Sequence, residues 1–227
     1  IFYYAMEYLD GLDLDGLIEK YGPQSEGRTI FILLQICGSL SEAHREGLIH
    51  RDVKPANVML TDRGGCADFV KVLDFGLVQA AGEEEKHVKG GGYAGTALYL
   101  APEAVTPGAR IDHRADIYAV GAIGYYLLTG TPPFMGNNDV AVLSAAVNDP
   151  LESPSSRRGK PIAADLEEAV VKCLQKKPGD RFASIDELTE ALVRCEANGT
   201  WTPKMAKDWW EAWKVLRNLK QTSRKAV

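Results

Sequence analysis

Cysteine is scarce in this sequence: four are present among 227 residues, at positions 37, 66, 173 and 195, and no two of them form a CxxC pair. This scarcity excludes a small disulfide-stapled fold, and it favours reduced thiols in apolar helical surroundings, as in a protein of the reducing cytosol. The remaining composition, 45% hydrophobic and 25% charged, is ordinary for a soluble folded domain. The length permits one domain or two small ones.

An excess of positive charge is also missing. The sequence has 26 Lys and Arg against 31 Asp and Glu, which gives a formal net charge of -5. A protein with this balance has no sequence-independent attraction to nucleic acid or to anionic lipid. We therefore expect no nucleic-acid partner.

Long apolar runs are absent as well. The longest charge-free run, residues 117–138, is interrupted by several glycines and by Pro132 and Pro133. Its helical part is about 12 residues, short of the ~20 that a bilayer requires, so it predicts a buried core helix. No signal peptide is recognisable at the start. The sequence opens directly inside an apolar run, residues 1–6, so we expect it to begin in mid-domain.

Hydrophobic periodicity predicts a mainly helical protein with a few short strands. A capping-box pattern, Ser-Ile-Asp-Glu, opens the last periodic segment at Ser184. The polar segments 76–100 and 149–161 show no period and are expected to be loops, the first of them long and mobile. The expected elements are a strand at 1–6, a short helix near 12–20, a long helix from Pro23 and Ser25 to Gly47, strands at 57–60 and 69–73 with a turn at 62–65, and helices at 114–129, 138–147, 163–174 and from Ser184 onward.

Three short motifs follow one another in the middle of the chain. They are His50-Arg51-Asp52-Val53-Lys54-Pro55-Ala56-Asn57, then Asp74-Phe75-Gly76, and then Ala101-Pro102-Glu103. In this order they resemble the H-R-D, D-F-G and A-P-E signatures of the protein serine/threonine kinases. The resemblance implies an α+β fold, the protein-kinase large lobe, mainly α-helical with short β-strands at the cleft. It also implies transfer of the γ-phosphate of ATP, with Mg²⁺, to Ser or Thr hydroxyls of a protein substrate.

Phosphoryl transfer explains the residue types in these motifs. The reaction needs a carboxylate that orients the attacking hydroxyl and accepts its proton, a cation near the transferred phosphate, and hard oxygen ligands for the metal. Asp52 suits the first role and Lys54 the second, while Asn57 and Asp74 suit the metal. The alternative, that Asp52 and Asp74 merely cap turns, leaves the surrounding pattern unexplained.

The kinase resemblance also assigns positions at the nucleotide pocket. Glu7 and Leu9 match the hinge, where their backbone would meet the adenine edge, and Asp13 is placed to reach the ribose. Met6 would be the gatekeeper, and Met59 would close the adenine pocket from below. An apolar strand that ends in Met and Leu is also typical of an ordinary core, so this alternative stays open.

Further matches concern the catalytic loop and its support. Thr96, in Gly95-Thr96-Ala97, matches the threonine that hydrogen-bonds the catalytic Asp and Lys in Ser/Thr-specific members, which argues against tyrosine specificity. Glu103 and Arg181 match the buried ion pair of the family. Asp116 matches the acid that holds the backbone of the catalytic loop, and its apolar surroundings argue for such a partner, because buried acids need one.

The resemblance covers residues 1–195 and predicts three parts: residues 1–10 as the last small-lobe strand and hinge, 11–195 as the large lobe, and 196–227 as a Trp-rich basic helix outside the kinase core. No Gly-rich phosphate loop, V-A-I-K strand or partner-glutamate helix occurs in the sequence. We therefore expect the small N-terminal lobe to be a missing intramolecular partner, and this chain to be a fragment of a longer kinase, inactive alone.

Two rival functions share parts of this pattern. A pseudokinase or scaffold module would keep the fold, but it usually loses one of Asp52, Lys54, Asn57 or Asp74, and all four are present. A small-molecule kinase would have a related catalytic loop but would lack the A-P-E motif. We expect a cytoplasmic enzyme, while a membrane anchor encoded outside this segment stays open.

Two features fall outside the motifs. The segment after residue 195 carries four tryptophans among Lys and Arg, which predicts either a helix docked on the large lobe or one that binds a membrane surface or a partner. The loop between Gly76 and Gly95 contains no Ser or Thr. We expect its acidic run, Glu83-Glu84-Glu85, to serve Arg51, or no loop anion to be needed, so that loop phosphorylation is not required.

Overall fold

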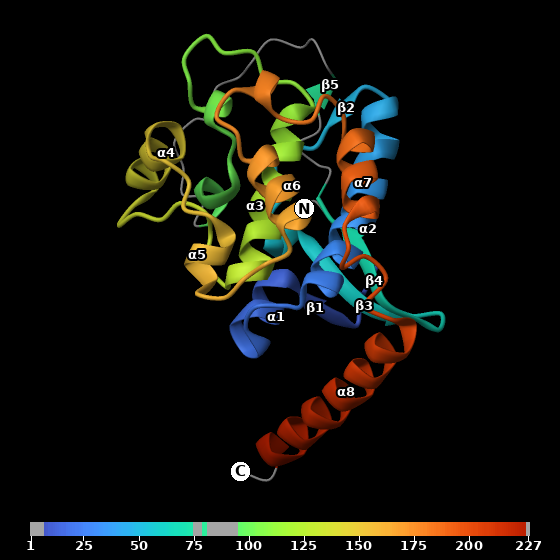
Figure 1. Ribbon diagram of the computed structural model, residues 1–227. Coiled ribbons are helices and arrows are strands. Elements are labelled where there is room, and N and C mark those ends of the chain that lie inside the picture. The colour runs from blue at the N-terminus through green and yellow to red at the C-terminus, as the bar shows by residue number, and fades with distance from the viewer. Residues whose placement is uncertain (1–6, 75–78, 81–94, 226–227) are drawn as a thin grey trace, which may run out of the picture.

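The protein is mainly helical and carries two small antiparallel sheets (Figure 1). This computed structural model describes residues 7–74, 79–80 and 95–225 of the chain. The helices are α1 (Leu14–Tyr21), α2 (Glu26–Arg45), α3 (Arg114–Thr129), α4 (Asp139–Asn148), α5 (Pro154–Arg158), α6 (Ala164–Cys173), α7 (Ile185–Arg194) and α8 (Pro203–Lys225). Short 3-10 turns are η1 (Pro55–Asn57), η3 (Thr96–Tyr99), η4 (Pro102–Ala104) and η5 (Pro178–Asp180).

The strands form the sheets β1-β3-β4 and β2-β5. Their bounds are β1 (Gly11–Asp13), β2 (Leu48–Ile49), β3 (Val58–Arg63), β4 (Cys66–Val72) and β5 (Gln79–Ala80). Gly64 and Gly65 join β3 to β4 with φ of 61° and 83°. A two-residue hairpin turn needs positive φ, which glycine adopts without steric cost, so the expected turn lies where the sequence placed it.

The helix α3 is the centre of the core. Each of its residues except Arg114 is buried, as the charge-free run predicted. It packs against α2 and α6, and its glycines allow the close approach. A Cβ at Gly121 would lie 2.4 Å from Cβ of Cys173 in α6, and one at Gly124 would lie 3.0 Å from Cδ1 of Leu33 in α2. In the part of the chain that is described, no helix has the length and apolarity to cross a bilayer.

The expected helices are all present within a few residues of their expected bounds, and their caps explain where they begin. The side-chain oxygens of Ser25, Asn138 and Ser184 accept backbone N–H bonds at the starts of α2, α4 and α7. The expected loop at 149–161 is wrong in part, because it contains α5. Ser153 caps this helix and Pro154 occupies its first position, where proline is favoured. The expected strand at 1–6 lies outside the described residues.

Three of the four cysteines are buried and all four are free. Burial raises the pKa of the Cys37 thiol to about 12 and that of Cys195 to about 11, and it raises the pKa of Cys173 as well. Cys66, at the start of β4, is exposed. The expectation of free thiols that lie mostly in apolar surroundings is therefore confirmed, and Cys66 is the exposed one of the four.

The helix α8 lies beside the β3–β4 hairpin and extends beyond the body of the protein (Figure 1). Trp210 and Trp213 are buried, with 1% and 9% of their surface exposed. Trp209 packs edge-on against Tyr21 of α1, with ring centroids 5.1 Å apart. Of the two alternatives for this segment, docking on the body of the protein is what the structure shows for its tryptophans.

Candidate active site

Three side chains from the expected catalytic set meet at one point. The Nζ of Lys54 donates hydrogen bonds to both carboxylate oxygens of Asp52, at 3.0 and 2.9 Å, and to Oγ1 of Thr96, at 2.9 Å. The side chains of Lys54 and Asp52 are 19% and 12% exposed, so water screens their attraction only partly. Thr96 belongs to η3, so this contact ties the segment before the A-P-E motif to the catalytic loop.

Asn57, at the end of η1, supports the same carboxylate. Its Nδ2 donates to the backbone oxygen of Asp52 at 2.9 Å and to Oδ2 of Asp52 at 3.0 Å. No hydrogen bond among the described residues uses the amide oxygen Oδ1. A buried side chain therefore keeps one hard oxygen, the type of ligand that Mg²⁺ takes.

Asp74 follows β4, and the residue before it, Leu73, is hydrogen-bonded to the backbone of Asn57. The N–H of Leu73 donates to the carbonyl oxygen of Asn57 at 2.8 Å. Asp74 has a left-handed φ of 58° and an exposed side chain, a conformation that costs a non-glycine residue about 1 to 3 kcal/mol and is found mostly at functional sites. Mg²⁺ usually takes one or two protein carboxylates and completes its shell with phosphate oxygens and water. The donor set of Asn57 and Asp74 fits this ion.

The carboxylate of Asp116 holds the catalytic loop from behind. Its Oδ2 accepts the backbone N–H of His50 at 2.9 Å, and its Oδ1 accepts that of Arg51 at 2.8 Å. The ring of His44 in α2 adds a third contact, with Nε2 2.8 Å from Oδ2. Arg51 has a φ of 64°, and these bonds hold it in that left-handed conformation. The expected role of Asp116 as the support of the loop is confirmed.

His50 connects the two ends of the catalytic set. Its Nε2 lies 3.0 Å from the carbonyl oxygen of Leu73, and its Nδ1 lies 3.3 Å from the backbone N of Asp52. A carbonyl only accepts and a backbone N–H only donates, so these partners assign the ring proton to Nε2. The buried imidazole thereby links the residue before Asp74 to Asp52. The sequence argument gave His50 no role of its own, although its place in the H-R-D motif was the available signal.

Two of the residues expected at the nucleotide pocket lie in one row of the three-stranded sheet. Asp13 in β1 pairs with Met59 in β3, and Met59 pairs with Lys71 in β4. Directly paired residues share a face of a sheet. The two carboxylate oxygens of Glu7 bind Arg63 and Lys71, and the hydrogen bond from Lys71 lowers the pKa of Glu7. The structure thus places Asp13 and Met59 in one cross-strand row, and it binds Glu7 to Lys71 of the same row.

Of the other expected pocket residues, Glu7 and Leu9 lie outside this cross-strand row. Leu9 is half-buried, and Met6 lies outside the described residues. Asp13 also caps α1, because its Oδ1 accepts the N–H of Gly16 at 2.7 Å. The structure leaves the nucleotide contacts of Glu7, Leu9, Asp13 and Met59 as expectations.

An acidic residue outside the sequence motifs, Asp15, lies near Lys54. Burial, followed by the charges of Asp13 and Glu19, raises the pKa of the Asp15 carboxyl, while a hydrogen bond with Tyr126 and the charge of Lys54 act in the opposite direction. Asp15 is in the first turn of α1. The carboxyl groups of Asp13, Asp15 and Glu19 are thus close enough to interact, and Asp15 also interacts with Lys54.

The end of the A-P-E motif is fixed by a buried ion pair. Arg181 donates from Nη1 and Nη2 to the two carboxylate oxygens of Glu103, both at 2.7 Å. The same guanidinium donates to the carbonyl oxygens of Arg114, Gln175 and Lys176. The guanidinium thus uses all its N–H donors, and each carboxylate oxygen of Glu103 accepts a hydrogen bond, which offsets the cost of burying the pair. The expected Glu103–Arg181 pair is confirmed.

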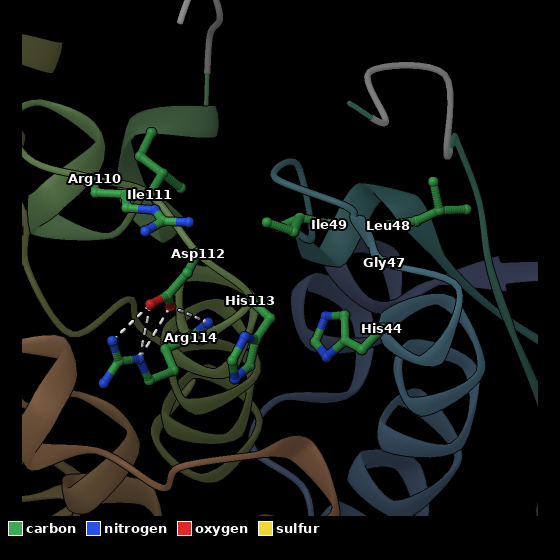
Figure 2. A pocket seen from close by; sticks show the side chains of 9 residues that line it. All are labelled: His44, Gly47, Leu48, Ile49, Arg110, Ile111, Asp112, His113 and Arg114. Atoms are coloured by element: carbon green, nitrogen blue, oxygen red, sulfur yellow. Dashed lines mark hydrogen bonds and ion pairs between the residues drawn. The ribbon is translucent and has the colours of Figure 1, made fainter. Parts of the chain in front are cut away.

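A cavity of about 480 Å³ opens behind the catalytic loop, between the end of α2 and the start of α3 (Figure 2). His44 and His113 contact each other edge to face there, with ring centroids 5.6 Å apart, and Asp112 binds Arg114. None of the expected catalytic or metal-binding residues lines it. The catalytic set is thus grouped at a different place from this hollow. The acidic run Glu83-Glu84-Glu85, expected to serve Arg51, lies outside the described residues.

Comparison with known proteins agrees with this arrangement. The model of the protein kinase domain family matches residues 1–193. The chain is 38% identical over 223 residues to serine/threonine-protein kinase PknB of Mycobacterium tuberculosis (strain ATCC 25177 / H37Ra), an alignment that covers 97% of this chain and 33% of PknB.

Two kinases of Myxococcus xanthus are also similar. Serine/threonine-protein kinase Pkn1 is 42% identical over 190 residues, covering 84% of this chain and 27% of Pkn1. Serine/threonine-protein kinase pkn3 is 38% identical over 192 residues, covering 83% of this chain and 35% of pkn3. The chain therefore spans about a third of the length of these relatives.

Proposed function

Because the chain belongs to the protein kinase family, beside the bacterial eukaryotic-like serine/threonine kinases, we propose that it carries the catalytic residues of a protein serine/threonine kinase. The reaction is transfer of the γ-phosphate of ATP to a Ser or Thr hydroxyl of a protein substrate. The observation that carries this proposal is the contact of Lys54 with both Asp52 and Thr96. It supports a carboxylate and a cation poised together in a partly buried site.

Each side chain of the set has a role in this mechanism. Asp52 orients the substrate hydroxyl and accepts its proton, and the side chains of Asn57 and Lys54 hold its carboxylate in place. Lys54 stabilises negative charge on the transferred phosphoryl group, and Thr96 fixes its ammonium. Asn57 Oδ1 and the Asp74 carboxylate would hold Mg²⁺, which would neutralise negative charge on the nucleotide phosphates when bound.

The division of the chain follows the same proposal. Residues 1–10 are the last small-lobe strand and hinge, 11–195 the large lobe, and 196–227 an additional helical segment. The pairing of Asp13 with Met59, in the row whose Lys71 binds Glu7, supports a nucleotide pocket beside these strands. The phosphate loop and its lysine would belong to a small lobe, so we assign activity to the complete protein and expect none from this segment alone. ATP as donor and the buried thiols support a cytoplasmic location.

The test is phosphotransfer by the complete protein. It is incubated with Mg-ATP labelled at the γ-phosphate and a generic Ser/Thr protein substrate, and the labelled amino acids are identified after hydrolysis. Labelled phosphoserine or phosphothreonine is expected. Nucleotide binding without any transfer, under conditions in which a known kinase labels the same substrate, would instead support the pseudokinase alternative.

A further inference from the structure

The carboxylate of Asp68 in β4 is fully buried and accepts four hydrogen bonds. Two come from Nε and Nη2 of Arg28, at 2.9 and 2.8 Å, and two come from the indole nitrogens of Trp201 and Trp210, both at 2.8 Å. Four donors fill the four lone-pair positions of a carboxylate. The C-terminal segment therefore supplies half of the donors around a buried ion pair of the domain.

The same segment covers the other partner of that pair. The rings of Trp201 and Trp209 lie over the guanidinium of Arg28, with centroids 4.8 and 4.0 Å from its central carbon. The approach depends on Gly27, because a Cβ there would lie 2.1 Å from Oγ1 of Thr200. The buried carboxylate, the guanidinium and the close approach at Gly27 together fix Thr200 and Trp201, which lead into α8, and Trp209 and Trp210 in its first half.

The second half of α8 reaches toward the expected hinge. Lys214 binds Asp62 of β3 at 2.5 Å, and Arg217 binds Asp10. The guanidinium of Arg217 also lies over the ring of Trp213, 5.0 Å from its centroid. Positions 210, 213, 214 and 217 recur at helical spacing, so one face of α8 carries the anchor and both ion pairs.

Asp10 is the last residue of the expected strand-and-hinge segment, 1–10, and this segment is held at its other side as well. Glu7 is bound by Arg63 and Lys71 of the β3–β4 hairpin, to which α8 is itself docked. Between Glu7 and Asp10 lie Tyr8 and Leu9. Gly11, which follows Asp10, packs closely against β3, since a Cβ at this position would lie 2.0 Å from the carbonyl oxygen of Leu60.

We propose that α8 positions the hinge for the nucleotide, and that Arg217 is the positioning residue, acting through Asp10. This inference rests on the proposed function, because it needs a hinge that binds adenine. Removing Arg217 leaves the anchor at Asp68 intact but releases the segment Tyr8–Asp10 on the α8 side. The consequence falls on ATP binding and leaves the transfer step unchanged.

The test compares variants of the complete protein. Arg217→Ala is expected to raise the KM for ATP about two- to fivefold, the range that a single exposed ion pair supports, with kcat and the KM for protein substrate unchanged. Arg217→Lys should restore most of the affinity. The matched control is Lys207→Ala, also on α8, whose ammonium pairs only with Glu211 within the helix among the described residues.

A double-mutant cycle gives the decisive result. Asp10→Ala should have the effect of Arg217→Ala, and the two together should have no larger effect than either alone. Independent, additive effects, or a KM for ATP unchanged in Arg217→Ala while the wild-type protein is active, would overturn the positioning role. A wild-type protein that transfers no phosphate would overturn the proposed function instead.

Discussion

The Nε2 of His44 lies 2.8 Å from Oδ2 of Asp116, the same oxygen that accepts the backbone N–H of His50. A single buried carboxylate therefore joins α2, α3 and the catalytic loop. Hydrogen bonds to a buried charged group contribute about 1.5 to 3 kcal/mol each, and leaving a donor without its acceptor costs a similar amount.

Asp116→Asn in the complete protein should lower kcat at least tenfold, because an amide offers one acceptor oxygen to two backbone donors. The free energy of unfolding should fall by about 2 to 3 kcal/mol. Steady-state kinetics and urea unfolding measure the two effects. Asp112→Asn, four residues earlier and partly exposed beside Arg114, is the control, and it should leave kcat within a factor of two. An equal loss in both variants would argue against the anchoring role.

Asp52→Asn should remove most phosphotransfer while ATP binding stays nearly intact, because Asp52 acts on the substrate hydroxyl and does not grip the nucleotide. A general base of this type contributes about 10² to 10⁴ in rate. Initial rates and nucleotide titrations of the same preparation provide the measurement. Asp180→Asn changes an exposed acid and should leave both quantities unaltered. A large loss of ATP affinity in Asp52→Asn would contradict this assignment.

Asp74→Asn should weaken nucleotide binding itself, but only when Mg²⁺ is present. Replacing the carboxylate removes the negative charge that favours the ion, whereas the apolar surroundings of the base are unchanged. Titrating ATP with and without Mg²⁺ against the wild type and this variant separates the two contributions. Should Asp52→Asn and Asp74→Asn bind Mg-ATP equally well, the division of roles between the two acids is wrong.

Cys66 should be the thiol that reacts in the folded protein. The thiolate is the nucleophile, and burial holds the pKa values of Cys37 and Cys195 at about 12 and about 11, so these groups stay protonated at pH 8. Titrating residues 1–227 with a disulfide reagent at this pH should release one equivalent of chromophore when native and four in denaturant. Cys66→Ser should reduce the native value to zero; two or more rapid native equivalents would contradict the buried positions.

Residues 1–227 alone should show no detectable transfer and only weak affinity for nucleotide, because the phosphate loop and its lysine are not among them. The same radiolabel assay, run beside the complete protein, is the measurement. Transfer at the ~1 to 100 s⁻¹ of whole kinases would show that this segment suffices.

The sequence allowed the catalytic loop to be predicted at the level of single residues. Asp52, Lys54 and Asn57 lie within six positions, so their spacing alone brings them together, and the contacts of Asp116 and of Glu103 with Arg181 followed from the kinase resemblance. Helix positions followed from periodicity and caps. The five-residue helix α5 is too short to show a period, so the sequence pattern predicts a loop there.

The buried network around Asp68 could not be predicted. Its donors are separated from it by 40 positions at Arg28, 133 at Trp201 and 142 at Trp210. An amphipathic pattern tells which face of a helix is buried but not which partner covers it. The available signal in the sequence was Asp68, an acidic residue directly before an expected strand, together with the tryptophans after residue 195 that match no kinase motif. The left-handed φ of 55° at Asp68 has no signature in the sequence, because the residue is not glycine.

The docking of the C-terminal segment on α2 requires glycine at position 27, and this requirement can be checked in the sequences of related kinases. Even a single methyl group there would collide with Thr200, and it would also come within 2.9 Å of the backbone N of Trp201. A kinase that carries alanine or any larger residue at this position would have to shift the segment 197–201 away from α2. The joint presence of Gly27, Asp68 and Trp210 would therefore identify related kinases whose C-terminal helix is docked on the domain. In relatives that lack these residues, we expect the segment after the domain to be a linker.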